Sequence, residues 1–189
     1  MFDELNQAID EYLAKWQNLV AQRQNKEFFD RMKVCAVGWK TADLAEYDRL
    51  FAAWREACDQ IHVGLINDRW IATMHLKDSE LHGGVTIIKL MQRRPGSTDA
   101  VGLDHIDFMD MEETNTKAVL ADESDLKWTE EKNGLCQWTS VWFDGTEAKL
   151  RTGTVVDVCI DELEEVNSKL RGKYIRSTEA VGVVSTDVE

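Results

Sequence analysis

One feature of the sequence constrains the fold more than any other: the same order of expected elements, a strand, a helix and three strands, occurs twice. The first copy covers residues 32–39, 41–58, 61–66, 70–76 and 85–91. The second copy covers residues 103–108, 112–121, 127–132, 135–143 and 147–151. Each copy has one open sheet face, so the two bury their edges best by pairing side by side. We therefore expect an α+β fold with two βαβββ modules forming a cupped mixed sheet and helices outside.

Turn-forming residues separate the two copies and the strands within them. Arg94-Pro95-Gly96 contains the only proline of the chain and marks a linker. Asn133-Gly134 is the strongest two-residue hairpin signal, and Asp144-Gly145 repeats it. The expected order is an N-terminal helical extension, a first module, the linker, a second module, and a C-terminal helix with a tail, over residues 1–30, 31–92, 93–101, 102–160 and 161–189.

The N-terminal extension has apolar residues at three- and four-residue spacing from Phe2 to Val20, which predicts an amphipathic helix capped by Asp3. Its unbroken apolar stripe suits core packing or the seam of a homodimer. At the other end, Asp161 is expected to cap a helix that ends near Gly172. The segment 177–189 shows no clear pattern and is expected to be a loose tail.

Composition excludes several kinds of partner. The chain has 35 acidic against 22 basic side chains and a formal charge of -13, which disfavours nucleic acid and acidic lipid. No apolar run approaches the roughly 18–20 residues that span a bilayer, and no basic-then-apolar leader is present, so a cytoplasmic location is expected. The four cysteines are far apart, which predicts free buried thiols rather than a zinc or redox motif.

The strand expected at 103–108 alternates in character residue by residue. His105 and Asp107 fall on one face, and Ile106 and Phe108 fall on the other. The apolar pair is expected to pack against helices, so the imidazole and the carboxylate would line the cup. Most strand histidines are structural, but this placement makes His105 a candidate site residue.

The strand expected at 135–143 offers two indoles. Trp138 and Trp142 lie on one face together with Ser140, and the pattern leaves open whether that face or the opposite one meets the cup. In the cup they would suit a flat or apolar ligand, and elsewhere they would serve packing. The sequence lacks G-x-S-x-G, P-loop and dinucleotide-binding motifs, and no catalytic residue can be assigned.

The doubled strand, helix and three-strand unit, with Asp104-His105-Ile106 opening its second copy, resembles the vicinal-oxygen-chelate superfamily. That superfamily includes glyoxalases, extradiol dioxygenases and bleomycin-resistance proteins. The likeness covers residues 30–165 and points to the YecM-like branch. It is carried by four stretches in order: Gly64–Arg69, the loop and strand around His82, Arg94–Gly96 and Gly102–Ile106.

The resemblance implies a divalent metal in the cup, held by a histidine from the first strand of each unit and by His or Glu from the last strands. His105 matches the second-unit histidine, and His82 is a weaker metal candidate. The remaining positions depart from the pattern, because Lys33, Lys89 and Arg151 stand where ligands are expected. Three cations repel a divalent ion, which favours a site without metal or other cofactor.

Three functions follow from these residues. The first is a metal-free small-molecule binding module with a degenerate metal site, whose pocket uses Trp138, Trp142, Asp107, Lys33, Lys89 and Arg151 to hold an anionic or aromatic ligand. The second is a metal-dependent isomerase, lyase or dioxygenase using His105 and His82. The third is a structural or partner-binding protein whose cup is filled by its own side chains. The sequence does not decide whether the chain is an enzyme.

Overall fold

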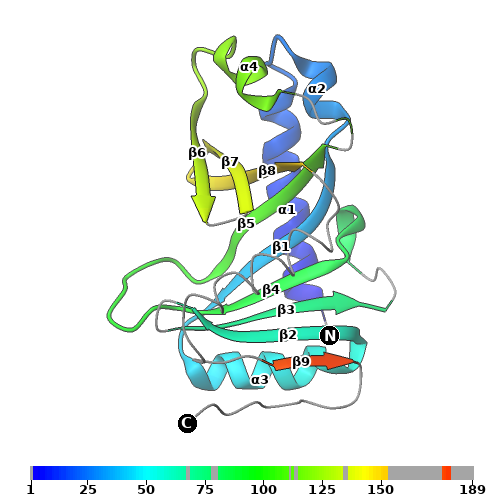
Figure 1. Ribbon diagram of the computed structural model, residues 1–189, viewed down its shortest axis with the longest axis vertical. Helices are drawn as coiled ribbons and strands as arrows, with labels where there is room; N and C mark the ends of the chain where they lie inside the picture. The colour runs from blue at the N-terminus through cyan, green and yellow to red at the C-terminus, as the bar shows by residue number, and fades with distance from the viewer. Residues whose placement is uncertain are drawn as a thin grey trace.

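The computed structural model describes residues 2–66, 69–77, 81–110, 112, 115–133, 136–152 and 176–179 (Figure 1). The α-helices are α1 (Asp3–Val20), α2 (Lys26–Asp30), α3 (Leu44–Trp54) and α4 (Thr116–Ala121), with single 3-10 turns η1 (Arg55–Ala57) and η2 (His82–Gly84). The strands are β1 (Lys33–Thr41), β2 (Cys58–Ile66), β3 (Arg69–Leu76), β4 (Ile87–Gln92), β5 (Gly102–Asp110), β6 (Lys127–Asn133), β7 (Cys136–Phe143), β8 (Thr146–Thr152) and β9 (Arg176–Glu179).

All of these strands belong to one sheet in the order β6-β7-β8-β5-β1-β4-β3-β2-β9. In each module the first strand pairs in parallel with the last, β1 with β4 and β5 with β8, and the remaining pairs are antiparallel. The two modules join through antiparallel pairing of their first strands, β1 and β5. The predicted α+β fold with two βαβββ modules in one mixed sheet is confirmed.

The N-terminal helix packs on the second module. Figure 1 shows α1 crossing behind β5 and β1. Trp16 stacks on Phe108 of β5 with ring centroids 4.4 Å apart, and the Tyr12 hydroxyl donates to the Glu147 carbonyl at 2.7 Å. Both α1 side chains are buried. Helix α4 of the second module has only six residues, so α1 covers much of the face that a longer crossover helix would cover.

Several element boundaries differ from the sequence-based expectation. Helix α3 begins after Asp43, whose carboxylate accepts from the Glu46 amide at 2.9 Å. The helix was expected from residue 41, but Thr41 is the last residue of β1. Asp3 is the first helical residue of α1 rather than its cap. The short helix α2 had no clear periodic signal. Residues 177–179 of the expected tail belong to β9, which pairs with β2. The helix expected at 161–172 lies outside the described residues.

Side chains alternate between the two faces of the sheet as the sequence pattern predicts. Ile106 and Phe108 join the core beneath the helices, and His105 and Asp107 lie on the opposite face, which we call the cup face. Cys35 and Cys58 are buried free thiols. Within the described residues, no helix is long and apolar enough to cross a membrane.

Candidate functional site

A buried ion-pair triad occupies the centre of the cup face. Asp107 Oδ1 accepts from Arg151 Nε at 3.0 Å, and Asp107 Oδ2 lies 2.9 Å from Lys89 Nζ. The three residues come from β5, β8 and β4, so the triad ties the two modules together. Asp107 is completely buried, and Lys89 and Arg151 are 6% and 2% exposed. Charges this deep in a protein persist only when they are paired, which makes the three groups dependent on one another.

The triad controls the ionisation of Asp107. Burial alone raises the pKa of this carboxyl, because it disfavours the charged form. Arg151 and then Lys89 oppose that effect and hold the pKa of Asp107 well below its ordinary value. Asp107 is therefore a carboxylate at neutral pH and does not act as a proton donor there.

His105 lies beside the triad, and a neighbouring carboxylate fixes its orientation. Its Nδ1 lies 3.0 Å from Asp104 Oδ2, so a protonated Nδ1 donates to Asp104, which also pairs with Lys40. The imidazole Nε2 then carries a lone pair, and it lies 4.0 Å from Asp107 Oδ2. Burial, aided by Lys149, lowers the pKa of His105 against the opposing effect of Asp104. The ring is neutral at pH 7.

Two features of the backbone make room for this arrangement. His105 pairs with Gly38 across β5 and β1, and a Cβ on Gly38 would lie 2.6 Å from His105 Nδ1. The imidazole therefore needs a glycine beneath it. Asp104 has no partner in the register, because Gly38 pairs with His105 and Trp39 pairs with Leu103. This bulge turns the Asp104 carboxylate toward its own neighbour, although adjacent strand residues normally face opposite ways.

A second group of polar side chains continues the cup face onto β7 and β8. The Trp138 ring lies 5.5 Å from Lys149 Nζ and 5.1 Å from the Arg151 guanidinium carbon, both cation–π distances. The Trp138 indole donates to the Ser140 hydroxyl at 3.2 Å, and that hydroxyl donates to Glu147. Asp107 pairs with Lys149 in the β5–β8 register, so their side chains share a face. The result is an aromatic and cationic surface next to the triad.

The structure brings together most of the residues expected in the pocket. Lys89, Asp107 and Arg151 meet in the triad, and Trp138 adjoins Arg151. The face bearing Trp138, Ser140 and Trp142 is the one that meets the cup, which answers the question that the pattern left open. Trp142 is partly buried at the rim, with Lys127 Nζ 5.3 Å from its ring centroid.

Two predicted residues lie apart from this group. Lys33 is exposed at the start of β1, where its register partner is Met109. His82 is exposed in η2, and its Nδ1 lies 2.8 Å from Asp10 Oδ2 on α1. Because α1 covers the face opposite the cup, His82 and His105 do not share a site.

Two further histidines lie on the cup face in the first module. His62 and His75 belong to β2 and β3, their rings are 5.8 Å apart, and both are buried. His62 is not at the edge of the sheet, because β9 pairs with β2 there. Burial, with a smaller effect from His62, lowers the pKa of His75.

These residues do not fit the divalent ion that the fold family implies. The donor pair beside the triad is His105 Nε2 and Asp107 Oδ2, which are 4.0 Å apart, and both Asp107 oxygens are already engaged by cations. Lys89 and Arg151 place two positive charges where the ion needs anionic or neutral donors. Over the part of the chain that the structure describes, no group of three or more His, Cys, Asp and Glu side chains is placed to hold a metal.

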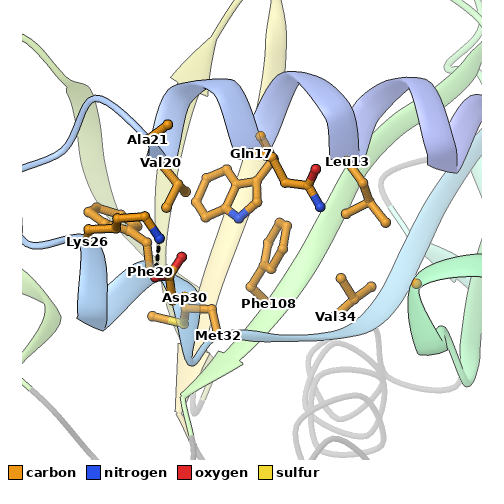
Figure 2. A pocket seen from close by; sticks show the side chains of 12 residues that line it. Leu13, Gln17, Val20, Ala21, Lys26, Phe29, Asp30, Met32, Val34 and Phe108 are labelled. Atoms are coloured by element: carbon orange, nitrogen blue, oxygen red, sulfur yellow. Dashed lines mark hydrogen bonds and ion pairs between the residues drawn. The ribbon is translucent and has the colours of Figure 1, made fainter.

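A separate cavity of about 590 Å³ lies on the helix side of the sheet, between α1, α2 and β5 (Figure 2). Phe29, Val34 and Phe108 line it, and its charged members, Lys26 and Asp30, pair with each other. Phe108 and Asp107 are neighbours on β5 and point to opposite faces, so this cavity does not connect with the triad through the sheet. The buried triad and His105 lie on the cup face, on the other side of the sheet from this cavity.

Several site residues could not be found from the sequence. Asp104 and Gly38 depend on the bulge and on pairing between strands far apart in the sequence. Alternation along β8 places Lys149 on the same face as Glu147 and Arg151, and that much could have been predicted. Alternation does not show whether a lysine on that face is buried or exposed.

Comparisons with known proteins support the fold. No family model matches the sequence, and no curated protein matches it. A structural-genomics protein, EC4020, is 19% identical with a TM-score of 0.55, over 85% of this chain and 93% of that chain. A hypothetical protein from Bacillus halodurans is 10% identical with a TM-score of 0.44, over 65% of this chain and 95% of that chain.

A weaker match is the fosfomycin resistance protein FosX from Listeria monocytogenes, solved with Mn(II) and sulfate. It is 14% identical with a TM-score of 0.24, over 71% of this chain and 94% of that chain. At this level of similarity it carries no argument about the chemistry of the present chain. The paired βαβββ modules in one curled sheet are themselves the vicinal-oxygen-chelate fold, so the expected fold is confirmed. A fold of this kind does not by itself establish a function.

Proposed function

We propose that this protein is a metal-independent binding module that holds a small organic anion on its cup face. The single observation that carries the proposal is the Lys89–Asp107–Arg151 triad, in which two cations share one buried carboxylate. Lys89 and Arg151 already neutralise the Asp107 carboxylate, so no divalent ion is needed for that purpose. Two cations against one carboxylate leave a positive charge, which suits a ligand of negative charge.

The charge of the site supports an anion. Among the described residues at the junction of β4, β5 and β8, Lys89, Lys149 and Arg151 face two carboxylates, those of Asp107 and Glu147, while His105 is neutral. One positive charge is therefore left over. It lies in a protein whose formal charge is -13, so the excess is local and is not a property of the surface as a whole. A carboxylate or phosphate binds most favourably where desolvated cations are held in place.

Trp138 supports a ligand with a flat portion. Its ring is partly buried beside Lys149 and Arg151, and the indole nitrogen is already bonded to Ser140. The face of the ring offers area for stacking at little entropic cost. A small planar carboxylate would place its charge toward the cations and its flat portion on the indole.

Binding can be tested with benzoate, lactate and inorganic phosphate by calorimetry and by the fluorescence of the tryptophans. At least one carboxylate should bind. Lys149→Met should lower the affinity for that carboxylate by about tenfold, the effect of losing one charge-assisted contact. Lys127→Met is the matched control, because Lys127 has the same cation–π geometry over Trp142 at an exposed position. Equal binding by wild type and Lys149→Met would contradict the proposal.

Metal independence needs its own test. Elemental analysis of protein purified without chelator or affinity tag should find far less than one equivalent of any transition metal, in wild type and in His105→Ala alike. One equivalent that is lost in His105→Ala would overturn the proposal in favour of the metal-dependent isomerase, lyase or dioxygenase. The YecM-like branch, the homodimer and the cytoplasmic location stay predictions alongside this function.

A further inference from the structure

We propose that Lys149 is a nucleophilic amine that captures a small 2-oxo acid as an imine on the cup face. This inference deepens the proposed function, since it rests on the same anion site and names the class of ligand. Among the described residues, the Lys149 side chain makes no hydrogen bond and no ion pair, although it faces the inside of the cup.

Two other lysines near the centre of the sheet differ from Lys149 in this respect. Lys40 pairs with Asp104, and Lys89 pairs with Asp107, so each of these side chains has a carboxylate partner. Lys149 instead lies near the Trp138 ring, with Nζ 5.5 Å from the ring centroid. Its side chain is partly buried, so part of it stays exposed while the rest is removed from water.

The surroundings of Lys149 make its ammonium group easier to deprotonate than that of an ordinary lysine. Burial lowers its pKa, and Lys89 and Arg151 lower it further against the opposing effects of Asp107 and Glu147. An amine that is desolvated and close to other cations is the arrangement that activates lysine for attack on carbonyl groups. The nearby acids are each engaged elsewhere: Asp107 by Lys89 and Arg151, and Glu147 by Ser140.

The reaction conserves atoms and electrons without an outside oxidant or reductant. The Lys149 Nζ lone pair attacks the keto carbon, a C–N bond forms, and the carbonyl π electrons move to oxygen. That oxygen leaves as water with the proton released from nitrogen and one from solvent, giving an iminium ion. Its positive charge takes the place of the ammonium charge, so Asp107 and Glu147 face a cation as before. The carboxylate of the 2-oxo acid meets the local excess of positive charge.

The test is reductive trapping on the full-length protein with pyruvate and phenylpyruvate in the presence of sodium cyanoborohydride. Reduction of the iminium adds the mass of the 2-oxo acid less one oxygen to a single lysine. We expect peptide mapping to find the adduct on Lys149, about tenfold faster than on Lys127, because the lowered pKa of Lys149 leaves more of this side chain as the amine. The rate at Lys149 should level off at a pH below the ordinary pKa of lysine.

The matched variants are Lys149→Met, which should abolish the adduct, and Lys127→Met, which should leave it unchanged. Adducts spread over exposed lysines at similar rates, or no adduct, would overturn the inference. Lactate resembles pyruvate but has no keto group, so its binding separates the two claims. Binding of lactate without trapping of pyruvate would leave the proposed function standing and reject the imine, whereas failure of every carboxylate to bind would reject the proposed function itself.

Discussion

Asp107 accepts a hydrogen bond from Arg151 Nε at 3.0 Å at a point where neither side chain is more than 2% exposed. The pair joins the first and last strands of the second module, and Lys89 extends it into the first module. A carboxylate in this position ties the two modules together, whatever part it has in the proposed binding site. Its loss would leave two buried cations without their counter-charge.

Asp107→Asn should therefore destabilise the protein by about 3–5 kcal/mol, the usual cost of removing one partner from a buried ion pair. Urea unfolding followed by circular dichroism measures this change. Asp30→Asn is the control, because Asp30 pairs with Lys26 at an exposed position and such pairs contribute about 0–1 kcal/mol. A loss of similar size in both variants would show that the triad is not a centre of stability.

Buried neutral histidines should make stability fall in mild acid. Burial lowers the pKa of both His75 and His105 in the folded protein, so the unfolded chain binds protons first as the pH falls. Their contribution to stability is complete above the unfolded pKa and is lost progressively below it. We expect the free energy of unfolding to decrease from about pH 7.5 to about pH 5, because the unfolded state binds more protons there.

His75→Gln is the variant that checks this, since glutamine does not titrate. Its unfolding free energy should change less over the same pH range than that of wild type. An NMR titration that places both imidazole pKa values above the unfolded value would contradict the expected sign.

Gly38→Ala should destabilise the protein by about 1–3 kcal/mol, because a methyl group there overpacks the buried imidazole of His105. The cost should shrink when the same substitution is made in a His105→Ala background, where the ring that it meets is gone. Equilibrium unfolding of the four proteins completes the double-mutant cycle. Equal costs in both backgrounds would show that the close approach of Gly38 and His105 is not what selects glycine.

Helix α1 should behave as part of the core and not as a removable extension. Trp16→Ala should cost about 3–5 kcal/mol, because it deletes a large buried ring stacked on Phe108. Tyr12→Phe should cost about 1 kcal/mol, because it deletes the hydrogen bond to the Glu147 carbonyl and keeps the ring. Thermal or urea unfolding measures both. A Trp16→Ala variant as stable as wild type would indicate that α1 only rests on the sheet.

The local pattern of the sequence was enough to predict the strands and their repeat. The alternation from Leu103 to Phe108 separates the helix face from the cup face, and Asn133-Gly134 and Asp144-Gly145 mark two of the hairpins. These signals are local, so spacing reports them directly. Lys89 and Arg151 were expected in the cup from the resemblance to the vicinal-oxygen-chelate pattern and not from alternation. The same resemblance placed Lys33 there, and Lys33 is exposed at the start of β1.

Other features were not available from local pattern. Which face of β7 meets the cup depends on the register of β7 with β8, and the position of His82 depends on where α1 packs. The contact of Asp104 with His105 depends on a bulge that breaks the alternation on which the prediction relied. Each of these involves residues distant in sequence or an irregularity in pairing.

The sequence by itself determined the two-module sheet and its helix face, because a period of two in apolar character decides which side chains are buried. Only the tertiary structure decided which charged side chains meet on the cup face. Pairing of β1 with β5 set His105 over Gly38. Pairing of β5 with β8 and of β1 with β4 brought Arg151 and Lys89 onto one carboxylate. Lys149 lacks such a carboxylate because Asp107 is already shared, and that difference arises from packing between strands and is absent from any local stretch of sequence.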